Sequence, residues 1–340
     1  SSILKFNDKN LIEKVVRAMS LLEMLKESGC PFVFKGGTAL MLALADSTHR
    51  LSIDIDIICP PGTEIEDYLS KYASHGFTDF ELVERQQRGI DIPKSHSKLF
   101  YQIAYKADAN TSSFILLDVL YEENYYTNLQ TVPIESPFVK LDGIPLTVSV
   151  PSIEDLIGDK MTAFAPNTTG IPYIKSGKST SMEIIKQLYD IGRLFERITN
   201  LGVASNTFKK VALIELSYRS IQEDLAVVYE DIRQTALCIS TRGVEGKGDF
   251  KALQNGILRI KSFMFNGRYT IEDAIIDASR AAYLATLIEK EGNEIERYSG
   301  DPSVVNQITI HSSLTNKLNK LKKTSPEAFY NWSRVSELLL

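Results

Sequence analysis

Apolar and polar positions follow two different periods along this chain, and the change between them predicts two domains. Up to about residue 150, short apolar runs with a two-residue period stand between stretches with a helical period, which is typical of a mixed α/β domain. After Pro151 the helical period dominates. We therefore expect an α/β domain over residues 1–150 and a mainly helical domain over residues 151–340.

Each domain has its own set of expected elements. In the first, helices are expected at residues 8–28, 38–45 and 62–76, and strands at 32–34, 51–59, 80–83, 99–105 and 114–121. In the second, helices are expected at residues 183–198, 208–225, 226–238, 249–265, 271–292 and 313–323. Residues 166–182 are rich in Pro, Gly, Ser, Thr and Lys, which predicts an exposed loop.

Composition and charge describe an ordinary globular protein and exclude two classes of function. Hydrophobic residues make up 44% of the chain, charged residues make up 24%, and the formal net charge is -5. This charge excludes an overall basic surface for nucleic acid, although a local basic patch stays compatible with it. No apolar run approaches the ~20 residues that a membrane-spanning helix needs, so we expect no membrane association.

Cysteine and histidine spacing gives no sign of a disulfide framework or a zinc site. The three cysteines are far apart and include no CxxC pair, which favours reduced thiols in a cytoplasmic protein. The four histidines show no metal-ligand spacing, so we expect no zinc. Candidate chemistry must therefore come from other residue types.

A strand that runs into two glycines and then a helix is a candidate phosphate-binding turn. The apolar run 32–34 leads to Gly36 and Gly37, and the expected helix begins at Thr38. Glycines let the backbone approach a ligand closely, and the N–H groups of a helix start suit phosphate oxygens. Thr38 adds a hydroxyl in the same place. Taken alone, the pattern fits an ordinary helix start equally well.

Two carboxylates follow within an apolar strand. In the run 52–58, a two-residue period puts Asp54 and Asp56 on one face and the alternating isoleucines on the other. Adjacent carboxylates repel each other and are costly there unless a cation lies between them. Mg²⁺ fits, with Mn²⁺ as an alternative, because it binds carboxylates together with substrate phosphates. Two solvated acids on an edge strand are the other reading, which the apolar flanks disfavour.

A third carboxylate, Asp118, stands alone in the apolar run 114–120. If its strand neighbours that of Asp54 and Asp56, the three acids would complete a two-metal site. Two metal ions would hold the attacking and leaving oxygens of a phosphoryl displacement. The alternatives are that Asp118 ends its strand or forms a salt bridge with a helix.

These residues together resemble the DNA polymerase beta nucleotidyltransferase superfamily. Within it, the AbiEii-type toxins, a group that includes the MenT toxins, typically show Lys-Gly-Gly-Thr-Ala-Leu followed by Arg-x-Ser-x-Asp-x-Asp. This chain has the first motif at residues 35–40 and the second at residues 50–56. The resemblance implies a polymerase-beta-type mixed-sheet domain followed by a helical domain. It implies a nucleotide site formed by Lys35, Gly36, Gly37, Thr38, Arg50, Ser52 and Lys160.

Two later motifs match the same group. One is Asp-Lys-x-x-Ala, which contains Lys160, and the other is Lys-x-x-x-Asp, from Lys186 to Asp190. Ile191 replaces the usual leucine, and Gln187 stands where a charged residue is frequent. The resemblance implies that Lys160 contacts the triphosphate and that Asp190 belongs to the catalytic centre. Periodicity alone favours a solvated lysine and leaves Asp190 as either a functional acid or a core partner.

The resemblance also implies a function. It is that of a metal-dependent toxin of a toxin–antitoxin system, held in check by a cognate antitoxin. Such an enzyme would transfer a nucleotide from a nucleoside triphosphate to an RNA acceptor, in particular the tRNA 3′ end, and release pyrophosphate. The catalytic residues would be Asp54, Asp56, Asp118, Lys160 and Asp190, the first three as metal ligands. Alternatives are a protein or small-molecule acceptor, or a nucleotide- or antitoxin-binding module without catalysis.

Two basic clusters in the second domain bear on the acceptor. Residues 242–268 carry six Lys and Arg side chains with interleaved aromatic residues, and Lys317, Lys320, Lys322 and Lys323 form a second cluster. In an acidic protein such local excess suggests a surface that faces RNA. The alternative is an ordinary helical face with lysine side chains that extend into solvent.

Overall fold

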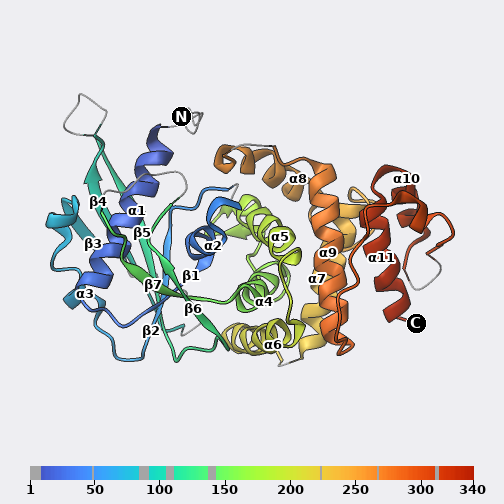
Figure 1. Ribbon diagram of the computed structural model, residues 1–340, viewed down its shortest axis with the longest axis horizontal. Helices are drawn as coiled ribbons and strands as arrows, with labels where there is room; N and C mark the ends of the chain where they lie inside the picture. Colours follow the sequence, from blue (N-terminus) through green and yellow to red (C-terminus); the bar gives the residue numbers. More distant parts are fainter. Residues whose placement is uncertain are drawn as a thin grey trace. The chain divides into compact units, whose positions relative to one another are not determined.

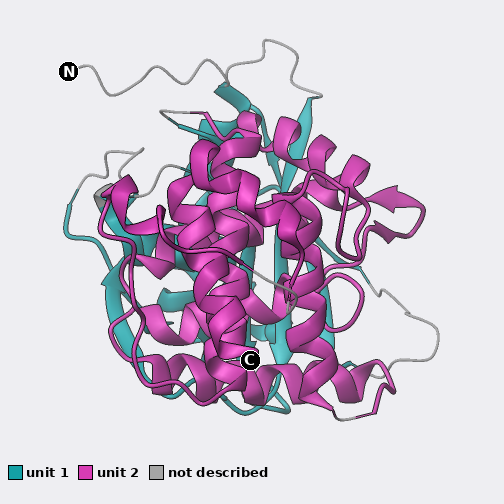
Figure 2. Cartoon of the chain, turned by 90° about the vertical axis from the view of Figure 1, so that its right-hand side faces the viewer, with its two compact units in different colours: residues 1–152, 263–267 teal, residues 153–262, 268–340 magenta. Residues whose placement is uncertain are grey.

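The computed structural model describes residues 9–47, 50–83, 92–104, 111–136, 143–222, 224–265, 268–310 and 314–340. The chain divides into two compact units, and Figure 1 and Figure 2 show their elements. The first unit consists of residues 1–152 and 263–267, and the second of residues 153–262 and 268–340. The predicted fold class is confirmed, because a mixed five-stranded sheet precedes a largely helical region.

The first unit is built around a mixed five-stranded sheet in the order β1-β2-β5-β4-β3 (Figure 1). Only the pair β2 and β5 is parallel, and the other neighbours are antiparallel. The strands are β1 (Val33–Lys35), β2 (Ile55–Cys59), β3 (Asp79–Val83), β4 (Lys94–Gln102) and β5 (Ser112–Tyr121). The parallel pair at the centre places two sequence-distant segments side by side.

One face of this sheet is covered by apolar side chains from two helices and a hairpin. The helices are α1 (Lys9–Glu27) and α2 (Gly36–Leu44), and the hairpin consists of β6 (Leu129–Pro133) and β7 (Thr147–Pro151). Their buried side chains share one core with the inward residues Phe34, Ile57 and Leu117. Because successive strand residues alternate between faces, the residues next to these three point to the opposite face.

Three of the predicted elements in this unit differ from the structure by more than two residues at one end. The strand expected at 51–59 begins only at Ile55, so Asp54 precedes it. The strand expected at 99–105 begins earlier, at Lys94. The helix expected at 62–76 is reduced to α3 (Ile65–Tyr68) and a 3-10 turn at Tyr72–His75. Only two residues of this stretch, Ile65 and Leu69, are buried, and a helix without a continuous apolar stripe is not stabilised.

The second unit is mainly helical, as predicted. Its centre is α9 (Ile271–Glu289), which is buried along most of its length and packs against α5, α7 and α11. None of the helices that the structure describes is both long and apolar enough to cross a membrane. The other α-helices are α4 (Ile153–Ala163), α5 (Ser181–Phe195), α6 (Leu201–Tyr218), α7 (Leu225–Ser240), α8 (Phe250–Arg259), α10 (Leu321–Thr324) and α11 (Pro326–Leu338).

Local signals explain where the second unit departs from the predicted elements. The expected loop at 166–182 contains a short hairpin, β8 (Ile174–Lys175) and β9 (Lys178–Ser179), which turns at Gly177 with a φ of 75°. Helix α6 begins earlier than expected because the Asn200 side chain caps it by accepting from the Val203 N–H. The helix expected at 313–323 is a 3-10 turn followed by α10, and α11 was not predicted.

A buried carboxylate, Asp277, joins two helices of the second unit. Its Oδ1 lies 3.2 Å from an Nη of Arg193, and the Tyr269 hydroxyl donates to its Oδ2 at 3.0 Å. A Cβ at Gly192 would lie 1.9 Å from Oδ1, so a glycine is required at the contact of α5 with α9. Burial raises the pKa of Asp277 to about 6, even though Arg193 and Arg280 lower it.

This raised pKa predicts a pH-dependent stability. The folded state holds the Asp277 proton up to about pH 6, whereas the unfolded chain releases it near 3.8. Stability from the protonated carboxyl is therefore present below 3.8 and lost as the pH rises to about 6, by up to about 3 kcal/mol. The measurement is urea unfolding of wild type and Asp277→Asn from about pH 4 to 7. The unfolding free energy of wild type minus that of the variant should fall as the pH rises. A constant or rising difference would contradict this assignment.

Candidate active site

Four polar side chains lie in one row across the sheet, on the face opposite to the core. Residues at paired positions of adjacent strands are Lys35 on β1, Asp56 on β2, Asp118 on β5 and His96 on β4. Directly paired residues point to the same face, so the row brings two of the predicted acids together. Asp118 is half-exposed next to Asp56, which is the arrangement on which the prediction for Asp118 depended.

The Gly36–Gly37 turn packs directly on the carboxylate row. Gly36 has a φ of 77°, and a Cβ there would lie 2.2 Å from Oδ2 of Asp56. A Cβ at Gly37 would lie 2.7 Å from the Ser52 hydroxyl oxygen and 3.0 Å from an Nη of Arg50. Two glycines are therefore required because three predicted site residues approach the turn this closely. The turn and the acidic strand form one assembly.

The Thr38 hydroxyl, which was predicted to add to the phosphate site, is bonded to the main chain. The residue is buried, and its Oγ1 donates to the main-chain carbonyl of Asp54 at 2.6 Å. This bond ties α2 to the residue just before β2, whose own side chain is exposed. The first N–H groups of α2 have no acceptor within the helix and remain the candidates for phosphate contact.

Lys35 is held by two tyrosines that the sequence did not single out. Its Nζ donates to the Tyr125 hydroxyl at 2.7 Å and lies 5.4 Å and 5.9 Å from the ring centroids of Tyr125 and Tyr126. Lys35 itself directly precedes the first residue of α2, and these contacts hold its ammonium group against the tyrosine rings. Arg50 is buried, and one Nη donates to the Leu51 carbonyl at 3.1 Å. The Arg50 guanidinium therefore lies beside the glycine turn, and Lys35 is the residue that leads into it.

His96 is a site residue that sequence reasoning missed. Its Nδ1 lies 2.6 Å from Oδ1 of Asp118. The histidines had been set aside because their spacing fits no metal site. Only the antiparallel pairing of β4 with β5 reveals the partnership, and that register cannot be obtained from spacing along the chain.

The acids fit a magnesium ion that is completed by its substrate. Among the described residues, no group of three or more His, Cys, Asp or Glu side chains is arranged to hold a metal ion. Asp54, Asp56 and Asp118 are therefore not a preassembled three-ligand site. Mg²⁺ is usually bound by one or two carboxylates together with substrate phosphates. Because Gly36 has no side chain, Oδ2 of Asp56 lies against the start of α2, where substrate phosphates would complete this binding mode.

Replacing Gly36 by alanine tests the contact between turn and strand. The new methyl group would displace the Asp56 carboxylate, so nucleotide transfer should fall at least about 100-fold, the cost of misplaced catalytic groups. Gly29→Ala is a matched control, because Gly29 has the same φ of 77° with no atom within 4 Å of an added Cβ. Both variants should lose about 1–2 kcal/mol of stability from backbone strain. If Gly36→Ala and Gly29→Ala transfer nucleotide at equal rates, the close contact between Gly36 and Asp56 is not needed for transfer.

In the second unit, the structure brings Lys160 and Asp190 together. Lys160 lies on α4 and Asp190 on α5, and their charged groups are 3.0 Å apart. The side chains are only 6% and 3% exposed. An ion pair buried to this degree is costly unless it is well bonded, so it must be held by its surroundings. Periodicity alone favours a solvated Lys160, which is wrong because the residue is buried, and it leaves Asp190 as either a functional acid or a core partner.

The two predicted basic clusters are partly used within the second unit. Arg242 pairs with Glu272, and Lys317 pairs with Glu245, each at 2.8 Å. Lys322 donates to the carbonyl of Asn306. Exposed basic residues around α8 are Lys247, Lys251, Arg259 and Lys261. Lys320 and Lys323 of the second cluster are exposed as well, so the interpretation as an RNA-facing surface rests on exposed residues of both clusters.

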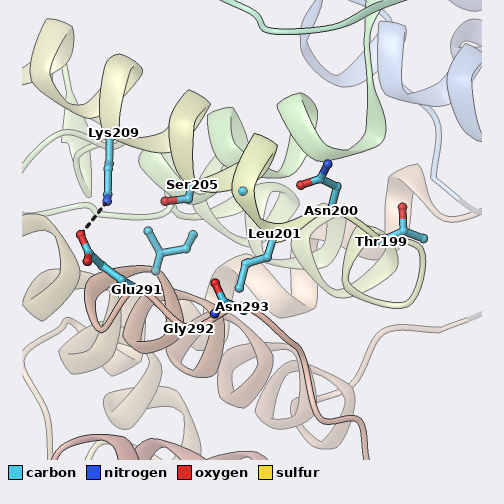
Figure 3. A pocket seen from close by; sticks show the side chains of 10 residues that line it. Thr199, Asn200, Leu201, Ser205, Lys209, Glu291, Gly292 and Asn293 are labelled. Carbon is cyan, nitrogen blue, oxygen red and sulfur yellow. Dashed lines mark ion pairs between the residues drawn. The ribbon is translucent and has the colours of Figure 1, made fainter.

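The second unit also contains a polar pocket of about 760 Å³. Figure 3 shows it between the start of α6 and the residues that follow α9, with Lys209 and Glu291 facing each other at 3.9 Å. None of the predicted site residues lines it. The lining residues are Thr199, Asn200, Leu201, Gly202, Ser205, Lys209, Ile288, Glu291, Gly292 and Asn293.

Comparisons with known proteins support the fold. The structure is similar to that of MenT4, a nucleotidyltransferase toxin from Mycobacterium tuberculosis H37Rv. The TM-score is 0.53 at 13% identity, over 80% of this chain and 82% of that one. JHP933 from Helicobacter pylori matches over 85% of this chain and 94% of its own, at 14% identity. Its TM-score of 0.40 is too low to establish a shared fold. No curated protein sequence matches this chain.

A family model reaches across both compact units. It is the model of the nucleotidyltransferase AbiEii toxins of type IV toxin–antitoxin systems, and it matches residues 20–261. The match includes the glycine turn, the acidic strand, Asp118 and the pair of Lys160 with Asp190. Because it covers more than half of the chain, the protein belongs to the AbiEii family of nucleotidyltransferase toxins.

Proposed function

We propose that this toxin transfers a nucleotide from a nucleoside triphosphate to the 3′ end of tRNA, with Mg²⁺ and with release of pyrophosphate. The observation that carries the proposal is the packing of the Gly36 turn on Asp56, since it puts a phosphate-binding helix start next to a metal-binding carboxylate. Catalysis would rest on positioning and on charge neutralisation, as in other phosphoryl transfers.

Each site residue has a proposed task. The first N–H groups of α2 bind the phosphates, with Lys35 and Arg50 beside them and Ser52 at the turn. Asp54 and Asp56 would hold Mg²⁺, and Asp118 would be a further ligand; when bound, the ion would neutralise charge on the phosphates. Asp118 or Asp190 would orient the attacking hydroxyl, and Lys160 would contact the triphosphate. The roles of Lys160 and Asp190 rest on the family resemblance.

The partners and the compartment belong to the same proposal. Membership of a toxin family of toxin–antitoxin systems supports a cognate antitoxin as a partner. Cys30, Cys59 and Cys238 are free and buried, which supports a reducing, cytoplasmic environment. The exposed basic residues around α8 support an RNA acceptor, because local positive charge attracts the phosphate backbone in an otherwise acidic protein.

The test is a labelling reaction. The purified protein is incubated with Mg²⁺, total tRNA and each α-labelled nucleoside triphosphate in turn, beside Asp56→Ala. Label on tRNA with wild type alone is the expected result. If tRNA stays unlabelled, the same reaction with cell lysate and candidate small molecules would show whether the acceptor is a protein or a small molecule. Binding of metal and nucleotide without any turnover would refute the proposed transfer.

A further inference from the structure

The hydrogen bond between His96 and Asp118 has no task in the proposed transfer of a nucleotide. Within the described residues, the imidazole is the only side chain that donates to the Asp118 carboxylate. An ionised carboxylate can only accept, so Nδ1 must carry the hydrogen and Oδ1 must accept it. This leaves Oδ2 of Asp118 as the oxygen that is open to a ligand. The bond therefore selects one orientation of the acid.

The position of Asp118 in the row across the sheet explains why this bond matters. Asp118 stands next to Asp56, and two neighbouring carboxylates repel each other. Asp118 could relieve the repulsion by turning into solvent, because its side chain is 40% exposed. His96 is only 17% exposed and lies on the far side of Asp118 from Asp56, so it can hold the acid in place. A largely shielded donor thus fixes a half-exposed acceptor.

We propose that His96 is a positioning residue, which holds the Asp118 carboxylate in the orientation needed for metal and nucleotide at Asp56. The proposal rests on the proposed function, since it gives His96 a task in the same site. A hydrogen bond to an exposed acid adds little to folding, so its loss should affect the site more than the fold. Partners that orient metal-binding groups typically change metal affinity or activity about 10–100-fold when they are removed.

The experiment compares two replacements of His96. His96→Asn keeps an N–H donor close to the position of Nδ1, whereas His96→Leu has a similar size and no donor. His75→Leu is the control, because His75 also contacts an acid of the first unit, Glu27, at 3.3 Å, away from the row. The readout is Mn²⁺ affinity in the presence of a nucleoside triphosphate with a methylene group between its α- and β-phosphorus atoms, measured by titration calorimetry.

We expect His96→Leu to weaken Mn²⁺ binding at least about tenfold. His96→Asn and His75→Leu should stay close to wild type. In turnover, His96→Leu should lower kcat and leave the KM for the nucleotide unchanged, and the asparagine variant should recover most of the rate. If His96 only stabilised the fold, His96→Leu would not lower kcat at an unchanged KM, and His96→Asn would not recover the rate.

Two results would overturn the inference in different ways. If His96→Leu binds Mn²⁺ as wild type does, the assignment of His96 is wrong and the proposed function stands. If wild type with the nucleotide analogue binds no Mn²⁺, the proposed metal-dependent function fails and takes the role of His96 with it. Circular dichroism of each variant confirms that the comparison is made between folded proteins.

Discussion

Asp56→Asn should abolish nucleotide transfer while the protein stays folded. Asparagine keeps the shape of aspartate, so the contact with Gly36 is preserved and only the charge is lost. Loss of a group that neutralises transition-state charge in phosphoryl transfer lowers kcat about 10³-fold or more. The melting temperature should be unchanged or slightly higher, since the repulsion with Asp118 disappears. Initial rates with labelled nucleotide and thermal unfolding measure the two effects.

A control variant distinguishes the loss of a site residue from a general change in the protein's net charge. Asp67→Asn removes the same charge from an exposed position of the same unit, outside the row. It should transfer nucleotide at the wild-type rate. If Asp56→Asn keeps more than about a tenth of the wild-type rate, Asp56 cannot be a metal ligand in the transfer step.

Lys160→Met should be the variant with the largest loss of stability. It leaves the Asp190 carboxylate buried beside an uncharged side chain, and breaking a buried ion pair in this way costs about 3–5 kcal/mol. If Lys160 also contacts the triphosphate, transfer should be lost even where the variant is still folded. Urea unfolding gives the stability, and transfer assays well below the unfolding midpoint give the activity.

The double variant Lys160→Met, Asp190→Leu separates the two effects. It removes both charges and replaces them with apolar side chains, so much of the lost stability should return. Nucleotide transfer should stay absent, because the proposed contacts to the triphosphate are gone. A double variant that is stable and active would show that the pair serves only the packing of α4 against α5.

Much of the first unit could be predicted because its signals are local. The alternation of apolar residues in 51–59 reveals a strand, and the two glycines at 36 and 37 reveal a turn. Neither signal shows where the strand starts. The structure begins it at Ile55, because Leu51 is instead bonded to Phe263 by a main-chain hydrogen bond that joins residues far apart in sequence.

The remaining features depend on pairing between distant segments. His96 becomes a site residue only through the register of β4 with β5, and a shift of one residue would turn it to the other face. Likewise, Lys160 and Asp190 become an ion pair only through the packing of α4 on α5. The hydrogen bond from the buried Thr38 hydroxyl to the Asp54 carbonyl could not be predicted either, because its acceptor is a main-chain atom that no motif displays.

Residues 263–267 belong to the first unit although residues 153–262 belong to the second, and this order has a consequence for biosynthesis. Leu51 N–H donates to the Phe263 carbonyl at 2.8 Å, and Arg50 forms a β-bridge with Met264. Arg50 is also the side chain that approaches Gly37. On the ribosome, the first unit therefore lacks these partners until residues 153–262 have been synthesised. The surroundings of the glycine turn are therefore completed late, so a nascent chain, or one that ends before residue 263, does not yet carry the complete candidate site.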